Sequence, residues 1–303
     1  MRVLLLHRLN LGDLVCANPG LQWLRRQRPE ATFRLLTNDF AARVGELLPE
    51  VERVLPYRKF SPSAPPEWRQ LLRARAWRPD RVVGLSPSPD RKLALRLRLF
   101  GAVAPEDLDS APSHAAERLA WILGWRGKEP LPPVRLRTPA ARGRARDLAI
   151  WVSARKPSNR PAAPQLLALV RELRARYASL SIGVFGLPGE TDSSAHVADA
   201  AGQSELARGL AQQGLVLETP PLDALLGEFA ASASVIAPDG GMAHLAAGFG
   251  KPVVVLFGEV EDPAHWRPWS PLARVLQAPS RRVPNLEPAA IADAWEAARA
   301  RAA

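Results

Sequence analysis

Cysteine is almost absent from this chain of 303 residues, because Cys16 is the only one. A single thiol excludes a disulfide within the chain and any zinc or iron–sulfur site built from several cysteines. Four of the five histidines are scattered without metal-ligand spacing, and we interpret each as structural: His7, His114, His196 and His265. The HExxH and nucleophile-elbow motifs are missing too, so the sequence predicts no metal site.

Long hydrophobic runs are also missing. No stretch approaches the roughly 18 uncharged apolar residues of a membrane helix, and the opening MRVLLLHR has only four apolar residues in a row before charge returns. We therefore expect no signal peptide and a cytoplasmic location. Glycine and proline make up 50 residues, apolar residues 47% and charged residues 23%. These are globular proportions, in a chain about twice the size of one domain.

Acidic residues are scarce in the first half of the chain. Residues 1–150 hold 27 Lys and Arg against 15 Asp and Glu, whereas residues 151–303 hold 14 against 15. The excess concentrates in residues 58–98, with 11 basic and three acidic side chains. A bias toward arginine explains why it outnumbers lysine 36 to 5, but not the asymmetry between the halves. The asymmetry predicts an anionic partner for the first half, such as phosphorylated lipid or nucleic acid.

Apolar runs of strand length alternate with segments of helical period, which is the pattern of βα units and parallel sheets. Strands are predicted at residues 3–6, 33–37, 53–56, 81–85, 148–153, 181–185, 215–217, 234–237 and 252–257. Helices are predicted at residues 12–28, 40–47, 65–76, 91–100, 113–123, 164–177, 191–201, 222–231, 241–249 and 288–300. The proline-rich segment 130–139 is the best linker candidate. We therefore predict two doubly wound α/β domains facing a cleft, residues 1–138 and 139–303.

The first candidate site follows the first predicted strand. Asn10, Gly12 and Asp13 stand where that strand gives way to a helix, and ligands of open α/β sheets bind at the carboxyl ends of strands. Gly12 permits a tight turn, and the helix dipole favours a carboxylate in the first turn. The alternative is that Asp13 only caps the helix.

The second candidate site is the segment Asp239, Gly240, Gly241, Met242 and His244, which follows the predicted strand 234–237. Two glycines let the backbone come close to a ligand, and free helix N–H groups suit a phosphate. The spacing matches neither GxGxxG nor a P-loop, so ordinary dinucleotide and Walker interpretations fail. The alternative is a capping aspartate and a buried helical histidine with its hydrogen bonds satisfied.

Two further candidates follow other predicted strands. Ser153, Lys156 and Arg160 belong to a loop whose three cations and two hydroxyls fit a diphosphate, although a solvated loop between domains would have the same composition. Glu190 follows the strand 181–185, where a carboxylate could bind a ribose diol.

Together these segments resemble a known family. The opening MRVLLLHRLNLGDLV (residues 1–15) with NPGLQWLRR (18–26), and the later PDGGMAHLAAGFGKPVVVLFG (238–258), are similar to the heptosyltransferase family, the ADP-heptose:lipopolysaccharide glycosyltransferases. The segments 153–160 and 185–190 fall between them in the family's order, so the resemblance covers essentially the whole chain. It implies a GT-B fold of two Rossmann-like domains, inverting transfer, and no need for a metal or cofactor.

The resemblance also implies roles for the candidate residues. Asp13 matches the family's general base, which takes the proton of the acceptor hydroxyl, and Asn10 and Gly12 lie beside it on the acceptor side. The donor-binding residues by this match are Ser153, Lys156, Arg160, Glu190, Asp239, Gly240, Gly241, Met242 and His244. Residues 1–138 would then be the acceptor domain, and residues 139–303, ending in the helix 288–300, the nucleotide-sugar domain.

The chain departs from the family pattern in three places. Gly240 stands where the family usually has Thr or Ser, and the segment 159–161 lacks the family's tryptophan, so the match of Arg160 could be shifted by one residue. The family's Gly-Pro-Thr-Asp-Pro is replaced by the longer and more acidic GEVEDP at 258–263. These departures put the donor in question more than the fold.

The sequence thus predicts a bacterial glycosyltransferase that moves a sugar, with heptose as the leading candidate, from a nucleotide diphosphate to an anionic glycolipid or glycan such as the lipopolysaccharide core. The basic N-terminal half would meet the acceptor at the inner face of the inner membrane. Two alternatives stay open: a nucleotide-sugar epimerase or hydrolase of the same fold, and a non-catalytic module that binds nucleotide sugars or nucleic acid. The basic window lacks interleaved aromatic residues, which argues against single-stranded nucleic acid.

Overall fold

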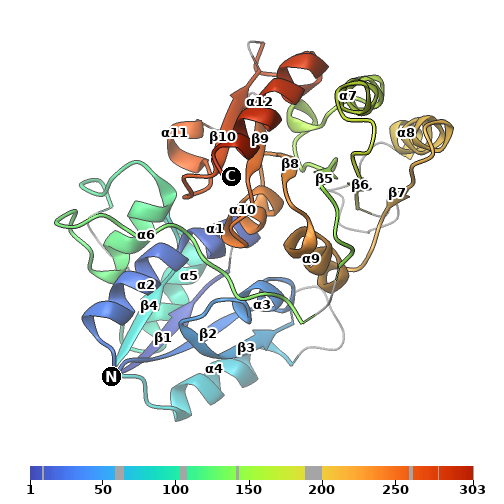
Figure 1. Cartoon of the computed structure of the whole chain (residues 1–303). Helices are drawn as coiled ribbons and strands as arrows, with labels where there is room; N and C mark the ends of the chain where they lie inside the picture. The colour runs from blue at the N-terminus through green and yellow to red at the C-terminus, as the bar shows by residue number, and fades with distance from the viewer. Residues whose placement is uncertain are drawn as a thin grey trace. The chain divides into compact units, whose positions relative to one another are not determined.

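The computed structural model describes residues 1–8, 10–58, 65–102, 108–140, 143–187, 200–258, 262–278 and 280–302. The chain divides into two compact units, Met1–Arg137 (unit 1) and Thr138–Ala303 (unit 2), which are described separately. Figure 1 shows that each unit is built around its own sheet.

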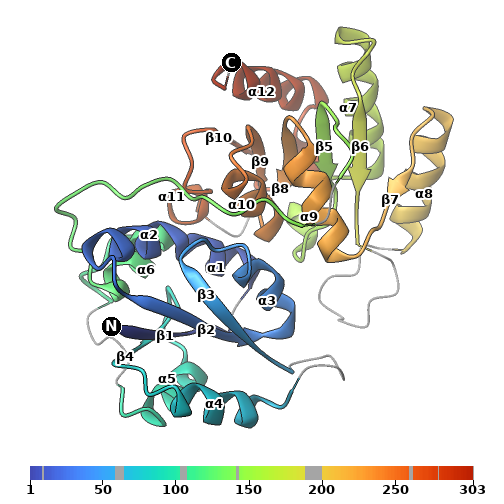
Figure 2. The ribbon, with the colours of Figure 1, turned by 60° about the horizontal axis from the view of Figure 1, so that its bottom comes forward.

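Unit 1 contains a parallel sheet in the order β3-β2-β1-β4. The strands are β1 (Arg2–Leu6), β2 (Thr32–Asn38), β3 (Val51–Tyr57) and β4 (Arg81–Gly84). The helices are α1 (Leu11–Cys16), α2 (Asn18–Gln27), α3 (Asp39–Gly45), α4 (Glu67–Ala76), α5 (Arg91–Arg98) and α6 (Ala115–Leu123). Helices α4 and α5 cover one face of this sheet, and α1, α2, α3 and α6 lie on the other (Figure 2).

The single helix predicted over residues 12–28 is wrong, because the chain forms two helices, α1 and α2, that meet at Ala17. Within one continuous helix, Pro19 could not donate to the carbonyl four residues earlier, and its ring would crowd that carbonyl. In the observed structure Pro19 instead lies in the first turn of α2, where proline is tolerated.

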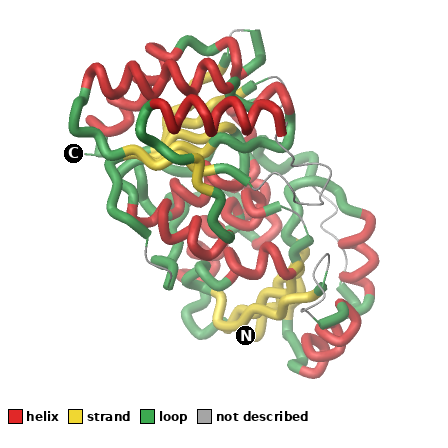
Figure 3. The backbone as a smooth tube through the Cα atoms, turned by 90° about the vertical axis from the view of Figure 1, so that its right-hand side faces the viewer, coloured by secondary structure: helices red, strands yellow, loops and turns green. Residues whose placement is uncertain are grey.

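Unit 2 contains a parallel sheet in the order β10-β9-β8-β5-β6-β7. The strands are β5 (Leu148–Trp151), β6 (Ile182–Phe185), β7 (Leu217–Glu218), β8 (Val235–Pro238), β9 (Val253–Phe257) and β10 (Ala273–Gln277). The helices are η1 (Pro157–Asn159), α7 (Ala163–Arg176), α8 (Ala200–Gln212), α9 (Leu222–Ala231), α10 (Gly241–Gly248), α11 (Pro263–Trp266), η2 (Val283–Asn285) and α12 (Pro288–Ala300). Figure 3 distinguishes these helices and strands along the backbone.

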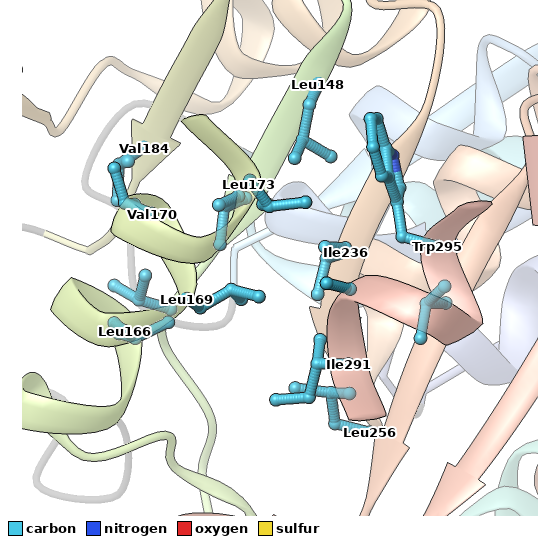
Figure 4. Close-up of a cluster of buried hydrophobic side chains, with 14 of the residues drawn as sticks. Leu148, Leu166, Leu169, Val170, Leu173, Val184, Ile236, Leu256, Ile291 and Trp295 are labelled. Atoms are coloured by element: carbon cyan, nitrogen blue, oxygen red, sulfur yellow. The ribbon is translucent and has the colours of Figure 1, made fainter. Parts of the chain in front are cut away.

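The core of unit 2 lies between its sheet and the helices α7 and α12. Leu169 and Leu173 of α7 and Trp295 of α12 are fully buried against strand residues such as Ile236 (Figure 4). The Trp295 indole N–H donates to Ser234 Oγ over 2.8 Å, which satisfies its polar atom inside the core. Burying side chains of this size contributes about 1.5–3 kcal/mol each.

The predicted fold class, two doubly wound parallel-sheet domains, is confirmed. Helices α8 and α11 and strand β10 were not predicted, and the helix predicted over 191–201 lies almost entirely outside the described residues. Within the described ranges, no helix combines the length and the apolar character that crossing a bilayer requires.

Candidate functional site

The order in which the chain adds strands to the sheet of unit 2 reverses between β5 and β8. The chain adds β6 and β7 on one side of β5, and then β8, β9 and β10 on the other. Ala149 pairs with Val235 and Ile150 with Ile236, so β5 and β8 end side by side. The carboxyl ends of strands at such a switch point form the usual ligand crevice of an open α/β sheet. Two of the sequence-predicted segments, those beginning at Ser153 and at Asp239, leave from these two strand ends.

The loop after β8 is built around an unusual glycine. Gly240 has φ 153° and ψ −177°, a region that is essentially closed to residues with a side chain. A Cβ at this position would meet nothing within 4 Å, so the backbone conformation rather than crowding requires glycine. The Asp239 N–H donates to the carbonyl of Leu256 over 2.9 Å, which fixes this turn to the end of β9.

Helix α10 begins directly after that turn, at Gly241. The first N–H groups of a helix have no acceptor within the helix, and its positive end favours an anion. Here the leading amides are those of Gly241 and Met242. The side chain of Met242 is buried, and so is that of His244, which is 4% exposed and packed inside the unit. The first turn of α10 therefore offers backbone donors, and the partly exposed Asp239 precedes it in the turn.

The loop after β5 is held in shape by its own polar residues. Ser153 Oγ accepts a hydrogen bond from the Leu187 N–H over 2.9 Å, which ties the end of β5 to the end of β6. Arg160 donates through Nε to the carbonyl of Ala154 (2.7 Å) and through a terminal nitrogen to that of Arg155 (3.3 Å). A guanidinium has five donors, so these contacts close the loop with only part of the hydrogen-bonding capacity of Arg160. Lys156 is half-buried in the same loop.

Gly258, directly after β9, lies against the loop that follows β5. The sequence did not predict that this position requires glycine. A Cβ at Gly258 would lie 2.3 Å from Asn159 Oδ1 and 2.7 Å from the carbonyl oxygen of Ser158. Only glycine lets the loop after β5 approach the end of β9 so closely. The structure therefore brings the ends of β5, β8 and β9 together. A glycine directly after the most hydrophobic strand was the one signal for this in the sequence.

Glu190, predicted to bind the ribose, lies outside the described residues.

In unit 1, Asp13 lies in the first turn of α1 and is 8% exposed. Its Oδ2 accepts a hydrogen bond from the backbone N–H of Asn10 over 3.0 Å. The structure thus brings Asn10 and Asp13 together, with Gly12 buried between them in the chain. The helix-capping contact considered as the alternative is present, and a carboxylate with two oxygens can make it while still taking a proton.

A charged cluster that the sequence analysis missed lies in the same unit. Arg8 pairs with Asp90 at 3.3 Å, and both side chains are less than a fifth exposed. Asp90 also caps α5 by accepting from the N–H groups of Lys92 and Leu93. Burial raises the pKa of Tyr57, the carboxylate of Glu67 raises that pKa further, and Arg8 lowers it. An acid at the start of a predicted basic helix was the available signal for this cluster.

Comparison with known proteins shows which family unit 2 resembles. The model of glycosyltransferase family 9 (heptosyltransferase) matches residues 193–295, about a third of the chain and within unit 2. No curated protein sequence gives a significant match.

Solved structures resemble the chain over its full length. The E. coli heptosyltransferase WaaC with ADP has a TM-score of 0.74 at 18% identity, covering 98% of this chain and 100% of that one. The E. coli ADP-heptose lps heptosyltransferase II has a TM-score of 0.76 at 18% identity, covering 100% and 99%. A family 9 glycosyl transferase from Veillonella parvula has a TM-score of 0.72 at 16% identity, covering 99% and 97%.

These structures establish that the chain has the GT-B fold of heptosyltransferases, as predicted. The family model confirms the resemblance to heptosyltransferases that the sequence motifs indicated, over residues 193–295. The matched segment includes Asp239, Gly240, Gly241, Met242 and His244, and it indicates a glycosyltransferase.

Proposed function

Taking the family match in unit 2 as the premise, we propose that this protein transfers a sugar from a nucleotide diphosphate to a hydroxyl of an anionic glycolipid or glycan. ADP-heptose is the leading donor candidate, and the lipopolysaccharide core is the leading acceptor candidate. The observation that carries the proposal is the pair of loops at the switch point of the unit 2 sheet. They leave β5 and β8 side by side, and the second lies inside the segment that matches the family model.

In this proposal the donor diphosphate lies against the start of α10. The amides of Gly240, Gly241 and Met242 would donate to its oxygens, and the helix dipole would favour its charge. The Gly240 backbone supports this assignment because it leaves open space where a side chain would otherwise project. Asp239 and His244 would contact the sugar or the phosphate, and Glu190 the ribose.

The loop after β5 would neutralise the leaving group. As the glycosidic bond breaks, negative charge grows on the diphosphate, and preorganised donors stabilise such charge most effectively. The Arg160 guanidinium, held by two backbone carbonyls, is preorganised in this sense. Ser153 and Lys156 belong to the same loop and would support it, so the transfer would proceed without a metal.

Asp13 would act as the general base. The acceptor oxygen attacks the anomeric carbon, its proton passes to the Asp13 carboxylate, and the bond from that carbon to the diphosphate oxygen breaks. Both electrons of that bond leave with the diphosphate. Attack opposite the leaving group inverts the configuration of the sugar. General base catalysis of this kind typically contributes about 10²–10⁴-fold to the rate.

The acceptor would meet the basic unit 1. Phosphorylated glycolipids carry the negative charge that the excess of arginine attracts, and the acceptor would be reached by peripheral contact with the inner face of the inner membrane.

A donor-consumption assay tests the proposal. ADP-heptose, GDP-sugars and UDP-sugars are incubated with the protein, with and without an anionic glycolipid, and nucleotide release is measured. Transfer requires release that depends on the acceptor. Equal release without acceptor would instead identify a hydrolase or an epimerase, and no release or binding with any nucleotide sugar would overturn the proposal.

A further inference from the structure

Helices α4 and α5 carry apolar side chains on two opposite sides. Their inner sides pack on the sheet of unit 1, with Ala74 of α4 and Leu93 and Leu97 of α5 buried. Leu95 lies two residues from both Leu93 and Leu97. Two residues correspond to about 200° around the helix, so Leu95 faces outward. Leu95 is 62% exposed. With most of its surface exposed, Leu95 contributes little to packing within the unit.

The outward apolar residues form a ridge on each helix. Trp68 and Leu72 are 57% and 59% exposed on α4, and Leu95 and Leu99 are 62% and 53% exposed on α5 and at its end. Each pair is four residues apart, so its members are neighbours on one side of their helix. We call these four residues the apolar ridges. Single exposed apolar residues are ordinary, whereas grouped ones mark an interaction site.

Side-chain contacts join the two helices into one surface. Glu67 of α4 forms an ion pair with Arg96 of α5, and the Arg75 guanidinium donates to the carbonyl of Leu99. Figure 2 shows α4 and α5 next to each other on the same face of the sheet. The two apolar ridges therefore belong to one face of unit 1.

Unpaired positive charge surrounds the ridges. The three carboxylates of the basic window are all engaged: Glu67 pairs with Arg96, Asp80 with Arg2, and Asp90 with Arg8. Six exposed cations on these helices have no carboxylate partner among the residues that the structure describes: Arg69, Arg73, Arg75, Arg91, Lys92 and Arg98. Acidic side chains are thus already neutralised on this face, and the remaining charge is positive.

A hollow of about 380 Å³ lies beside α4, where this helix meets β2 and β3, and it adds to the positive charge. It is lined by Arg34, Arg53 and Arg73, with Leu55 and Ala76. Arg34 and Arg53 are direct neighbours on β2 and β3, and like charges opposite each other in a sheet are unfavourable. The Arg34 guanidinium also stacks on the Trp77 ring at 4.3 Å. Three guanidinium groups around one hollow match the oxygens of a phosphate.

We propose that the face formed by α4 and α5 docks on a bilayer that contains anionic phospholipid, with the apolar ridges inserted among the headgroups and a lipid phosphate in the hollow. Tryptophan and leucine flanked by arginine and lysine are the composition of helices that lie at a membrane surface. A nucleic acid would match the charge but would leave four apolar side chains without a role. A protein interface would match the ridges but typically excludes so much charge of one sign from its core. This inference gives the membrane contact of the proposed function a defined surface, but it does not depend on sugar transfer.

Vesicle flotation of the full chain tests this surface. Wild-type protein should float with vesicles of phosphatidylcholine and phosphatidylglycerol and stay unbound with phosphatidylcholine alone. Leu72→Glu and Leu95→Glu should each weaken binding about tenfold. Val216→Glu is the matched control, because Val216 is 70% exposed in unit 2, and it should bind as the wild type does. The double variant Arg91→Glu with Arg98→Glu should weaken binding at least about 25-fold, because each of the two lost arginines contributes about fivefold.

One further control and one further test variant complete the experiment. Arg171→Glu with Arg301→Glu makes the same change of charge at exposed positions of unit 2, and it should weaken binding far less. Arg53→Ala with Arg73→Ala should weaken binding to phosphatidylglycerol while thermal unfolding stays unchanged. The proposal is overturned if wild-type protein does not bind anionic vesicles, or if the ridge variants and their controls bind them equally. Nucleotide-sugar turnover in detergent, measured on the same samples, shows separately whether the proposed transfer fails.

Discussion

The two units offer anions different kinds of binding group. The first half of the chain carries 27 Lys and Arg against 15 Asp and Glu. Its helices α4 and α5 expose cations that have no carboxylate partner within the described ranges. The second half is nearly balanced, with 14 against 15, and its strand ends offer backbone amides at Gly241 and Met242 and one arginine held in a loop. A spread of side-chain charge suits a large anionic surface, whereas fixed backbone donors suit one small phosphate group. This comparison predicts that changes in unit 1 and in unit 2 have separable effects.

The largest expected effect comes from Asp13 in unit 1. Asp13→Asn removes the carboxylate that we propose as the base but keeps an oxygen that can accept from the Asn10 N–H. We therefore expect the kcat of transfer to fall about 10²–10⁴-fold. Nucleotide binding, which we assign to unit 2, should stay within about twofold of the wild type by calorimetry. Asp39→Asn is the matched control, because Asp39 stands in the first turn of α3. Wild-type kcat in the Asp13 variant would remove that residue from the base role.

The next effect separates donor binding from stability in unit 2. Gly240→Ala forces a side chain into a glycine-only conformation, which costs about 1–3 kcal/mol of stability and should weaken donor binding about tenfold by displacing the start of α10. Gly250→Ala is its control, since Gly250 also has a positive φ of 71° with nothing near its missing Cβ. Gly250 precedes β9, so it lies at the amino ends of the strands and away from the loops after β5 and β8. Equal donor affinity in the two variants would argue against a donor site at Gly240.

Gly258→Ala tests whether the loop after β5 must reach the end of β9. The new Cβ would collide with Ser158 and Asn159, so the loop must move, and a donor Kd about three- to tenfold higher is expected. Gly186→Ala has contacts of 3.3–3.5 Å instead, so it should change Kd less. Fluorescence titration with ADP measures both, and an unchanged Kd for the Gly258 variant would contradict the arrangement.

The smallest effect concerns the stability of unit 1. Burial raises the pKa of Glu50 above its ordinary value, against the lowering effect of the hydrogen bond from Asn18. The folded state therefore binds this proton more tightly than the unfolded state, and stability falls as pH rises from the ordinary carboxyl pKa through the raised one. Glu50→Gln should stabilise the protein by about 1 kcal/mol at neutral pH and by nothing in acid, as urea unfolding at two pH values would reveal. Equal effects at both pH values would contradict this account.

The fold was largely predictable because its signals are local. The helix predicted at 288–300 has the observed bounds, Pro288–Ala300, because a proline opens it and alanines fill it. Both loops at the switch point were found because each follows a buried strand. Strand β10 was missed because its sequence, ARVLQ, is short and carries only two strongly apolar residues.

The rest of the site and the α4–α5 face depend on tertiary packing. The alternating leucines at 93, 95, 97 and 99 are apolar at every second position, and only the packed structure separates the buried pair from the exposed pair. The close approach at Gly258 joins segments about a hundred residues apart in the chain, which no local pattern reveals.

Hydrogen exchange with and without a nucleotide-sugar donor tests the central claim most directly, namely that the backbone at the β5 and β8 strand ends of unit 2 binds the donor. We expect ADP-heptose to slow exchange most strongly in peptides covering residues 153–160 and 239–244, and to leave the α4–α5 face of unit 1 unchanged. Protection confined to unit 1, or none in these two segments at saturating donor, would contradict the account.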